Sequence, residues 1–516
     1  MIRKLVCFLM LSGTFMVAAF TQGKDPVDIG NRRELFLDNL LVDRFEGEAR
    51  RVFHKPVPRE IVMTFDDPNE ANSWGYATVF KDGDLYRMYY RSARIEVRED
   101  GSVGYLVPQH IAYAESPDGI HWKRPILGLI ELAGSKENNV VWKGVGSHAW
   151  VPFKDDNPDS LPEARYKAVG FRRGPGPFPE ADKELVAYQS PDGLHWELIQ
   201  EEAILDDGNF DSQNVVFWDP NTKAYRAYYR YSQRVFGDGD NLGRGIKTAT
   251  SPEFNRNWPE QGTELIHLQR PPAQFYTNQI RPYHRAPHIY IGMPGMYENR
   301  RWSSAMEQLP NLNERLAYYE AIGRLSRGPI GGGTLLMWSR DGVSFERSPS
   351  EFLRPGPERP GSWWYGDHWA AWHLVETEPF LEGAARELSL YAAEKAGSNN
   401  LGDRVRRYTL RLDGFASIHA PINGGELITP PLVFDGSALS MNFATSAFGS
   451  LRVELQDADG APIPGFMLDD SIELYGDTVA REARWENDPD LKALAGKPVR
   501  LRFVMRDADL YSIRFE

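Results

Sequence analysis

Apolar and polar residues alternate in short runs along most of the chain, as they do in β-strands that bury one face. One such run, residues 110–114, leads into the phrase SPDGIHW at residues 116–122. The phrase returns as SPDGLHW at 190–196, as SRDGVSF at 339–345, and in degenerate form at 251–258. An Asp-Gly pair after a strand predicts a tight turn, because glycine readily takes the positive φ that hairpin turns require.

A second phrase precedes each of these turns. YRMYYR at 86–91 and YRAYYR at 225–230 are near copies, and related strands occupy 166–171, 288–292 and 387–392. Upstream of each lies a further apolar strand, at 76–80, 149–153, 214–218, 279–283 and 369–375. Five four-stranded units therefore fit between about residues 70 and 412, which is the repeat pattern of a five-bladed β-propeller. The alternative is a set of unrelated hairpins in one large sandwich.

The pattern changes after residue 412. Short strands alternate with turns at 439–443, 450–455, 499–505 and 511–515. About a hundred residues of this kind predict a β-sandwich. The predicted fold class is therefore all-β, with a propeller over residues 23–412 and a β-sandwich over residues 413–516. The few aromatic residues in the loops of the sandwich favour a structural cap over a sugar-binding module.

The first 22 residues have the pattern of a signal peptide. Arg3 and Lys4 precede an apolar stretch, and small residues follow near a cleavage position. The alternative is a buried N-terminal helix. Cys7 is the only cysteine and lies in this segment, so the mature chain would have neither disulfides nor thiolate chemistry. We expect a secreted or periplasmic protein, and the mature part has no apolar run of the length that spans a bilayer.

Charge and motif content exclude several functions. The net charge of −13 argues against a nucleic-acid partner, which needs a basic face. The histidines have no metal-ligand spacing, and there is no dinucleotide fingerprint and no Gly-x-Ser-x-Gly elbow. We therefore predict neither a metal nor a cofactor.

Candidate catalytic residues come from the position in the repeat that directly precedes each first strand. In a propeller these strands line the axis, so the residues before them converge in one funnel. Three carboxyl groups occupy this position: Asp211, Asp367 and Glu70. Cleavage of a glycosidic bond uses two carboxyl groups, one protonated and one ionised. The alternative is that they are ordinary turn residues, since Asp is common in turns.

Further residues are predicted to bind the substrate, which we expect to be a carbohydrate. Aromatic and polar neighbours of the carboxylates would contact a sugar ring, and arginines and histidines of the fourth unit would bind an acidic group on it. The alternative for each arginine is an ion pair with one of the many acidic residues. Glu394 follows a second strand and is expected at the periphery. The full set is His148, Gln213, Arg281, Arg285, His288, Trp364, His368 and Glu394.

The repeated turn phrase resembles blade motifs of the five-bladed glycoside hydrolases of families 32, 43, 68 and 130. The stretches 276–288, 354–363 and 406–415 resemble family 32-like exported proteins of planctomycete-type bacteria. This resemblance implies a five-bladed propeller that hydrolyses glycosidic bonds. The Trp-x-Asn-Asp-Pro-Asn-Gly motif of family 32 is missing, so invertase or fructanase activity is not expected. A family 130-like phosphorylase and a non-catalytic sugar-binding propeller remain the alternatives.

Overall fold

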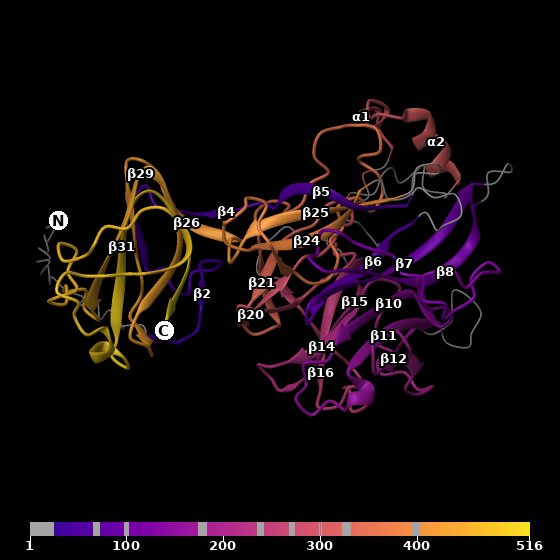
Figure 1. The fold of residues 1–516 in the computed structure, drawn as a ribbon, viewed down its shortest axis with the longest axis horizontal. Coiled ribbons are helices and arrows are strands. Elements are labelled where there is room, and N and C mark those ends of the chain that lie inside the picture. Colours follow the sequence, from indigo (N-terminus) through magenta and orange to yellow (C-terminus); the bar gives the residue numbers. More distant parts are fainter. Residues whose placement is uncertain are drawn as a thin grey trace, which may run out of the picture.

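The computed structural model describes residues 25–65, 73–97, 103–173, 183–234, 242–267, 274–298, 300, 302–321, 332–394 and 403–516. The predicted signal peptide and Glu70 lie outside these residues. The described chain is built almost entirely of β-strands, which form five small sheets and one large one (Figure 1). The two short helices, α1 (Ser304–Glu307) and α2 (Leu312–Ala321), lie in an insertion after β20.

Each of the five small sheets is one blade, as the repeats predict. The first contains β6 (Gly75–Asp82), β7 (Leu85–Val97), β8 (Val103–Ser116) and β9 (Val140–Trp142). The second contains β10 (Gly146–Lys154), β11 (Tyr166–Arg173), β12 (Lys183–Ser190) and β13 (Glu197–Leu198). The third contains β14 (Val215–Asp219), β15 (Ala224–Arg234), β16 (Leu242–Ser251) and β17 (Thr263–Glu264).

The fourth and fifth blades depart from this regular order. The fourth contains β19 (Arg281–Tyr283), β20 (Ala286–Gly292), β21 (Met337–Ser339) and β22 (Ser344–Arg347), with β18 (Ile266–His267) added in parallel at its outer edge. The fifth contains β23 (Val375–Thr377), β24 (Glu387–Glu394) and β25 (Arg404–Arg411), and its outer strand is β5 (Val57–Thr64). The five-bladed prediction is confirmed by this topology.

The N-terminal strand β5 closes the ring of blades. It pairs antiparallel with β25, so residues far apart in sequence share the last blade. At the axis the ring is closed a second time, because the Trp372 amide donates to Ala77 O (2.8 Å) and the Val79 amide to Trp372 O (3.1 Å). A closed ring leaves few free strand edges, which limits edge-to-edge association.

In three of the five blades the repeated turn phrase joins the blade to the one before it. The Tyr391 hydroxyl of the fifth blade donates to Gly119 O, Tyr89 of the first to Gly193 O, and Tyr228 of the third to Gly342 O, at 2.5, 3.0 and 2.8 Å. In each turn the Asp carboxylate accepts two backbone amides, which holds the glycine at positive φ. The sequence repeat therefore encodes contacts between blades as well as local turns.

We expect Gly193→Ala to destabilise the propeller. Gly193 has φ +79°, and a Cβ there would lie 2.6 Å from the hydroxyl of Tyr89, a buried side chain that cannot move away. Gly83→Ala is the matched control, because Gly83 has φ +62° but open space around its Cβ position. Overpacking adds about 1–3 kcal/mol to the strain that both variants share. Equal free energies of unfolding for the two variants, measured by denaturant titration, would contradict this role for the turn.

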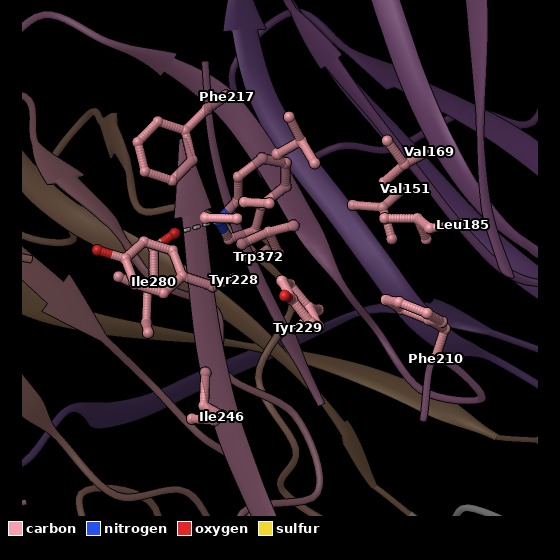
Figure 2. Packing of buried hydrophobic residues seen from close by; sticks show 14 of the residues in the cluster. Val151, Val169, Leu185, Phe210, Phe217, Tyr228, Tyr229, Ile246, Ile280 and Trp372 are labelled. Atoms are coloured by element: carbon pink, nitrogen blue, oxygen red, sulfur yellow. Dashed lines mark hydrogen bonds between the residues drawn. The ribbon is translucent and has the colours of Figure 1, made fainter. Parts of the chain in front are cut away.

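The centre of the propeller is filled by aromatic side chains. Trp372 is fully buried, and its indole N–H donates to Ile280 O at 3.1 Å. Its ring packs near Phe153 and Phe217, with centroid separations of 6.5 and 6.4 Å. Figure 2 shows this packing around Trp372 and Phe217, with Val151, Val169 and Leu185 to one side. The axis is therefore blocked at Trp372, and its two ends are separate surfaces.

The remaining strands form a second domain, seen on the left of Figure 1. Its ten strands share one apolar core and one hydrogen-bonded network dominated by β29 (Leu439–Asp457) and β31 (Val499–Phe515). The others from the C-terminal region are β26 (Ala416–Ala420), β27 (Gly425–Ile428), β28 (Leu432–Phe434) and β30 (Asp477–Glu482). The C-terminal region is thus all-β as predicted, while its division into two facing sheets stays a prediction.

Four N-terminal strands also belong to this domain, which corrects the predicted boundary at residue 23. They are β1 (Val27–Gly30), β2 (Glu34–Leu35), β3 (Arg44–Gly47) and β4 (Arg50–Phe53). They pair with β28, β31, β27 and β26 respectively. The propeller therefore begins at β5, after the chain has passed through the other domain.

A buried ionic cluster fixes the two domains to each other. The Asp413 carboxylate is fully buried and accepts hydrogen bonds from Arg285 Nε and the Tyr283 hydroxyl of the fourth blade, each at 2.8 Å. From the other domain it accepts the Ser512 hydroxyl at 2.8 Å and Arg33 Nη1 at 3.3 Å. These arginines hold the pKa of Asp413 below its usual range, although burial alone would raise it.

Candidate functional site

Polar and aromatic side chains meet at the end of the axis where the inner strands begin. We call this group the axis cluster: Tyr76, Arg91, His148, Asp211, Arg230, Arg244 and Tyr276. The hydroxyls of Tyr76 and Tyr276 lie 3.3 Å apart, and the His148 ring lies 5.9 Å from that of Tyr76. Members from the first, second and third blades therefore surround one point, as a propeller funnel requires.

Asp211 is the predicted catalytic residue that the structure places in the axis cluster. The preceding Phe210 is fully buried against Tyr229, and this packing fixes the position of the backbone next to Asp211. Its carboxylate forms an ion pair with Arg230, and 34 % of its side chain stays exposed. An adjacent guanidinium favours the ionised form of a carboxyl group. This position therefore suits a base, a nucleophile or a group that stabilises positive charge.

Asp367 and Trp364 are both buried, so neither side chain is exposed at the axis end, and their predicted roles stay predictions. Asp367 is fully buried and accepts the Trp364 amide at 2.9 Å, so its carboxylate caps its own turn. The Trp364 ring is buried, stacks 6.0 Å from Tyr319 of α2, and lies under the Arg315 guanidinium. Trp364 therefore packs the helical insertion against the segment that precedes the fifth blade.

Glu394 lies beside His368 in the fifth blade and forms ion pairs with two arginines. Glu394 accepts Arg406 Nε at 2.5 Å and lies 2.9 Å from Arg359 Nη2. These arginines hold the pKa of Glu394 below its usual range, although burial alone would raise it. Burial lowers the pKa of His368 to about 4, so this histidine is neutral at physiological pH. The pair is a structural element of the blade.

Gln213 and His148 have different surroundings. Gln213 is buried, donates to Ala77 O at 2.9 Å and accepts the Gln279 amide at 2.8 Å, which ties three inner strands together. His148 lies at the edge of the axis cluster, with Nδ1 3.0 Å from Gln109 Oε1. Burial, then the charges of nearby arginines, lower its pKa to about 3. His148 is therefore a neutral hydrogen-bonding group.

The three basic residues predicted from the fourth blade lie away from the axis cluster. Arg285 binds Asp413, and His288 Nε2 lies 3.0 Å from Glu34 Oε1, so both belong to the contact between domains. Arg281 pairs with Asp156 at 2.8 Å and lines a cavity of about 330 Å³ on the opposite side of Trp372. The prediction placed them at the funnel because the sequence does not show which end of the short strand β19 lies nearest to each of these side chains.

The sequence argument missed the arginines and tyrosines of the axis cluster. Arg91 and Arg230 end the two copies of the Tyr-Arg-x-Tyr-Tyr-Arg phrase, and each reaches the axis from the second strand of its blade. The repeat itself contained the information needed to find these arginines. A shared position that carries the same charged residue in two blades points to the same place in the fold.

Tyr276 differs from Tyr76, the other tyrosine of the axis cluster, because its pKa is lowered rather than raised. Its ring is sandwiched between Trp369, at 4.4 Å, and Tyr297, at 5.9 Å. Burial alone would raise its pKa, but the Arg230 guanidinium and the hydroxyls of Tyr365 and Tyr76 lower it below the usual range of tyrosine. Burial raises the pKa of Tyr76, so this pair loses its first proton from Tyr276.

Raising the pH should therefore ionise one tyrosine before the others. Tyrosinate absorbance in the ultraviolet should show an early step below the value near 10 of free tyrosine. Tyr276→Phe should remove that step. Tyr511→Phe, at a half-buried tyrosine whose pKa is raised to about 12, should leave it unchanged. A wild-type titration that begins only near the free-tyrosine value would contradict the role of Arg230.

A larger cavity of about 800 Å³ lies beside the helical insertion. Its lining includes Glu351, whose pKa is raised by burial, and Trp363, which is 38 % exposed and has φ +63°. An exposed tryptophan in a strained backbone conformation is common at functional surfaces. The cavity therefore joins a flat aromatic surface to a carboxyl group that is protonated more readily than usual.

Among the described residues, no helix is both long and apolar enough to cross a membrane. Within the same ranges, no three His, Cys, Asp or Glu side chains gather in an arrangement that could hold a metal ion.

The fold and this site together define an all-β protein with a five-bladed propeller and a polar, aromatic axis end. No protein-family model and no curated protein sequence matches the chain. Solved structures similar to it include a "Glycoside hydrolase" (TM-score 0.44, 11 % identity, 69 % of this chain and 92 % of that chain). They also include a family 43 arabinoxylan arabinofuranohydrolase from Bacillus subtilis (0.40, 11 %, 87 % and 97 %) and the GH32 β-fructofuranosidase of Bombyx mori (0.38, 8 %, 88 % and 94 %). Families 43 and 32 are thus among the structural neighbours, as the sequence resemblance predicted, but likeness at this level carries no argument about activity.

Proposed function

We propose that the protein is a glycoside hydrolase whose sugar-binding site is the axis cluster. The observation that supports this most is the position of Asp211, a partly exposed carboxylate at the meeting point of the blades. Near it, Trp369 provides a partly exposed aromatic ring of the kind that stacks on sugar rings. Hydroxyl and imidazole groups of Tyr76 and His148 complete a surface suited to a polyhydroxylated ligand.

The proposed chemistry assigns Asp211 the ionised role. Paired with Arg230, it would act as nucleophile, as base for water, or as stabiliser of the positive charge that develops on the sugar ring. Hydrolysis also needs a carboxyl group that is protonated before reaction. Glu351 has the raised pKa that this role needs, and Glu70 remains the partner predicted from sequence. We also propose that the mature protein is exported, because the first 22 residues have the pattern of a signal peptide.

Product analysis on a panel of oligosaccharides and polysaccharides tests this function. A hydrolase should release saturated sugars with new reducing ends in buffer that contains no phosphate. The Asp211→Asn variant, assayed beside the wild type, should release none above background. Absence of cleavage by the wild type across the panel would refute the hydrolase proposal and favour a non-catalytic sugar-binding propeller.

A phosphorylase is the second candidate. The observation that favours it is the presence of several arginines and His148 beside Asp211, since phosphorolysis needs a basic site for inorganic phosphate. A phosphorylase would cleave only when phosphate is supplied and would release a sugar 1-phosphate. Cleavage at the same rate with and without phosphate would exclude it.

A further inference from the structure

Three arginines in the axis cluster lie against aromatic rings. The guanidinium carbon of Arg91 lies 4.5 Å from the ring centroid of Tyr76, and that of Arg230 lies 5.2 Å from Tyr276. Arg244 lies 3.6 Å from the centroid of Tyr297. Stacking on rings fixes the planar guanidinium groups while their N–H groups keep the fork geometry that matches an oxyanion. The arginines are thus held in position before any ligand binds.

The charge at this point is opposite in sign to that of the whole protein. The chain carries a net charge of −13, yet Arg91, Arg173 and Arg230 all act on His148. Lys183 also lies in this field: burial, then the charges of Arg230 and Arg173, lower its pKa. A concentration of positive charge in an acidic protein has a cost, because like charges repel. Such a concentration is typical of a site that binds a negatively charged ligand.

Arg91 distinguishes this cluster from the structural arginines of the fold. Arg226, Arg340 and Arg406 each form an ion pair with a carboxylate at 2.5–2.8 Å. Arg91, by contrast, has no ion pair with any carboxylate in the described part of the chain. Its charge is left for a partner that the described protein does not supply. His148 is neutral at physiological pH and adds no charge beside it; its Nδ1–H donates to Gln109 Oε1, which leaves Nε2 as an acceptor.

We propose that the sugar unit bound in the axis cluster carries an anionic group, a carboxylate or a sulfate, held by Arg91 together with Arg230 and Arg244. The inference rests on the proposed function and adds its substrate class: an acidic glycan. Asp211 balances part of the positive charge of Arg230. The positive charge of Arg91 is not balanced in this way, so Arg91 should interact most strongly with an anionic group. It is therefore the residue whose removal should affect recognition most.

Calorimetric binding to matched pairs of oligosaccharides tests the inference without any need for turnover. One pair is oligogalacturonate and its carboxyl-reduced form; the other is a sulfated galactan oligosaccharide and its desulfated form. We expect the acidic member of one pair to bind at least about tenfold more tightly than its neutral counterpart. The pair that shows this preference identifies the anionic group as carboxylate or sulfate.

Variants of two arginines separate a specific contact from general charge. Arg91→Gln should abolish the preference for the acidic member, and Arg91→Lys should restore only part of it, because lysine lacks the planar fork. Arg256→Gln is the matched control, since Arg256 is exposed and pairs with Glu253 on the rim of the third blade. It should bind like the wild type, and thermal melts should show that all three variants fold.

Two results would overturn the inference. One is equal affinity for both members of each pair, or no binding of either acidic glycan. The other is competition by inorganic phosphate at the affinity of the acidic sugar, which would assign the cluster to a free oxyanion. Cleavage of a neutral glycan that depends on Asp211 would leave the hydrolase proposal standing while this inference failed. Binding of an acidic glycan that depends on Arg91, without hydrolysis of that glycan, would support this inference and contradict the hydrolase proposal.

Discussion

Asp211→Asn is expected to lower turnover on the correct glycan by about a thousandfold, within the range attributed to acid–base groups. The asparagine side chain has nearly the same shape, so substrate contacts by Tyr276 and Trp369 should persist. It carries no charge, so it can neither activate water nor stabilise an oxocarbenium-like transition state. The expected loss is therefore in kcat, with little change in KM.

Stability should change little in the same variant. The asparagine side chain keeps an oxygen that can accept a hydrogen bond from Arg230, so the buried guanidinium is not left without a partner. Asp206→Asn is the matched control, because Asp206 is an exposed carboxylate five residues earlier. It should keep wild-type activity. If Asp211→Asn retained activity within about tenfold of the wild type, Asp211 would be excluded as base, nucleophile or acid.

Trp372→Ala is expected to cost about 3–5 kcal/mol of unfolding free energy, the range for removing a large aromatic side chain from a core. Trp372 fills the propeller centre, contacts inner strands of several blades and donates its indole N–H to Ile280 O. No neighbouring side chain can fill the space without moving a strand. The ring closure at Thr78 lies directly beside this position, so its pairing should loosen as well.

Denaturant unfolding of Trp372→Ala and Trp363→Ala tests this account of the core. Trp363 is a tryptophan of the same size that is 38 % exposed, and we expect its removal to cost less than about 1 kcal/mol. A loss of unfolding free energy below about 1 kcal/mol for Trp372→Ala would contradict this account, because it would show that Trp372 contributes little to the stability of the propeller centre.

The propeller could be predicted because its determinants are local. Each Asp-Gly turn and each Tyr-rich strand is encoded within one blade, so five repeats define five sheets. The same repeats placed Asp211 at the start of an inner strand. The pairing of N-terminal strands could not be predicted, because β1 and β5 pair with partners more than 300 residues away. The segment around Asp38 and Asp43 lies in the other domain, and β5 closes the ring.

The candidate site was predicted only in part, for a geometric reason. A position in the repeat determines where a backbone lies, but the direction of a side chain depends on its own partners. Asp367 occupies the same place before an inner strand as Asp211, yet its carboxylate turns back to the Trp364 amide. Arg285 and His288 face acidic groups of the second domain, which the sequence of the propeller does not reveal.

A crystal structure of the Asp211→Asn protein bound to an acidic oligosaccharide would test the central claim most directly. The account predicts a sugar ring stacked against Trp369, with its glycosidic oxygen or anomeric carbon next to residue 211 and its anionic group at Arg91. A sugar found instead only in the cavity at the opposite end of the axis, lined by Arg281 and His373, would contradict the account.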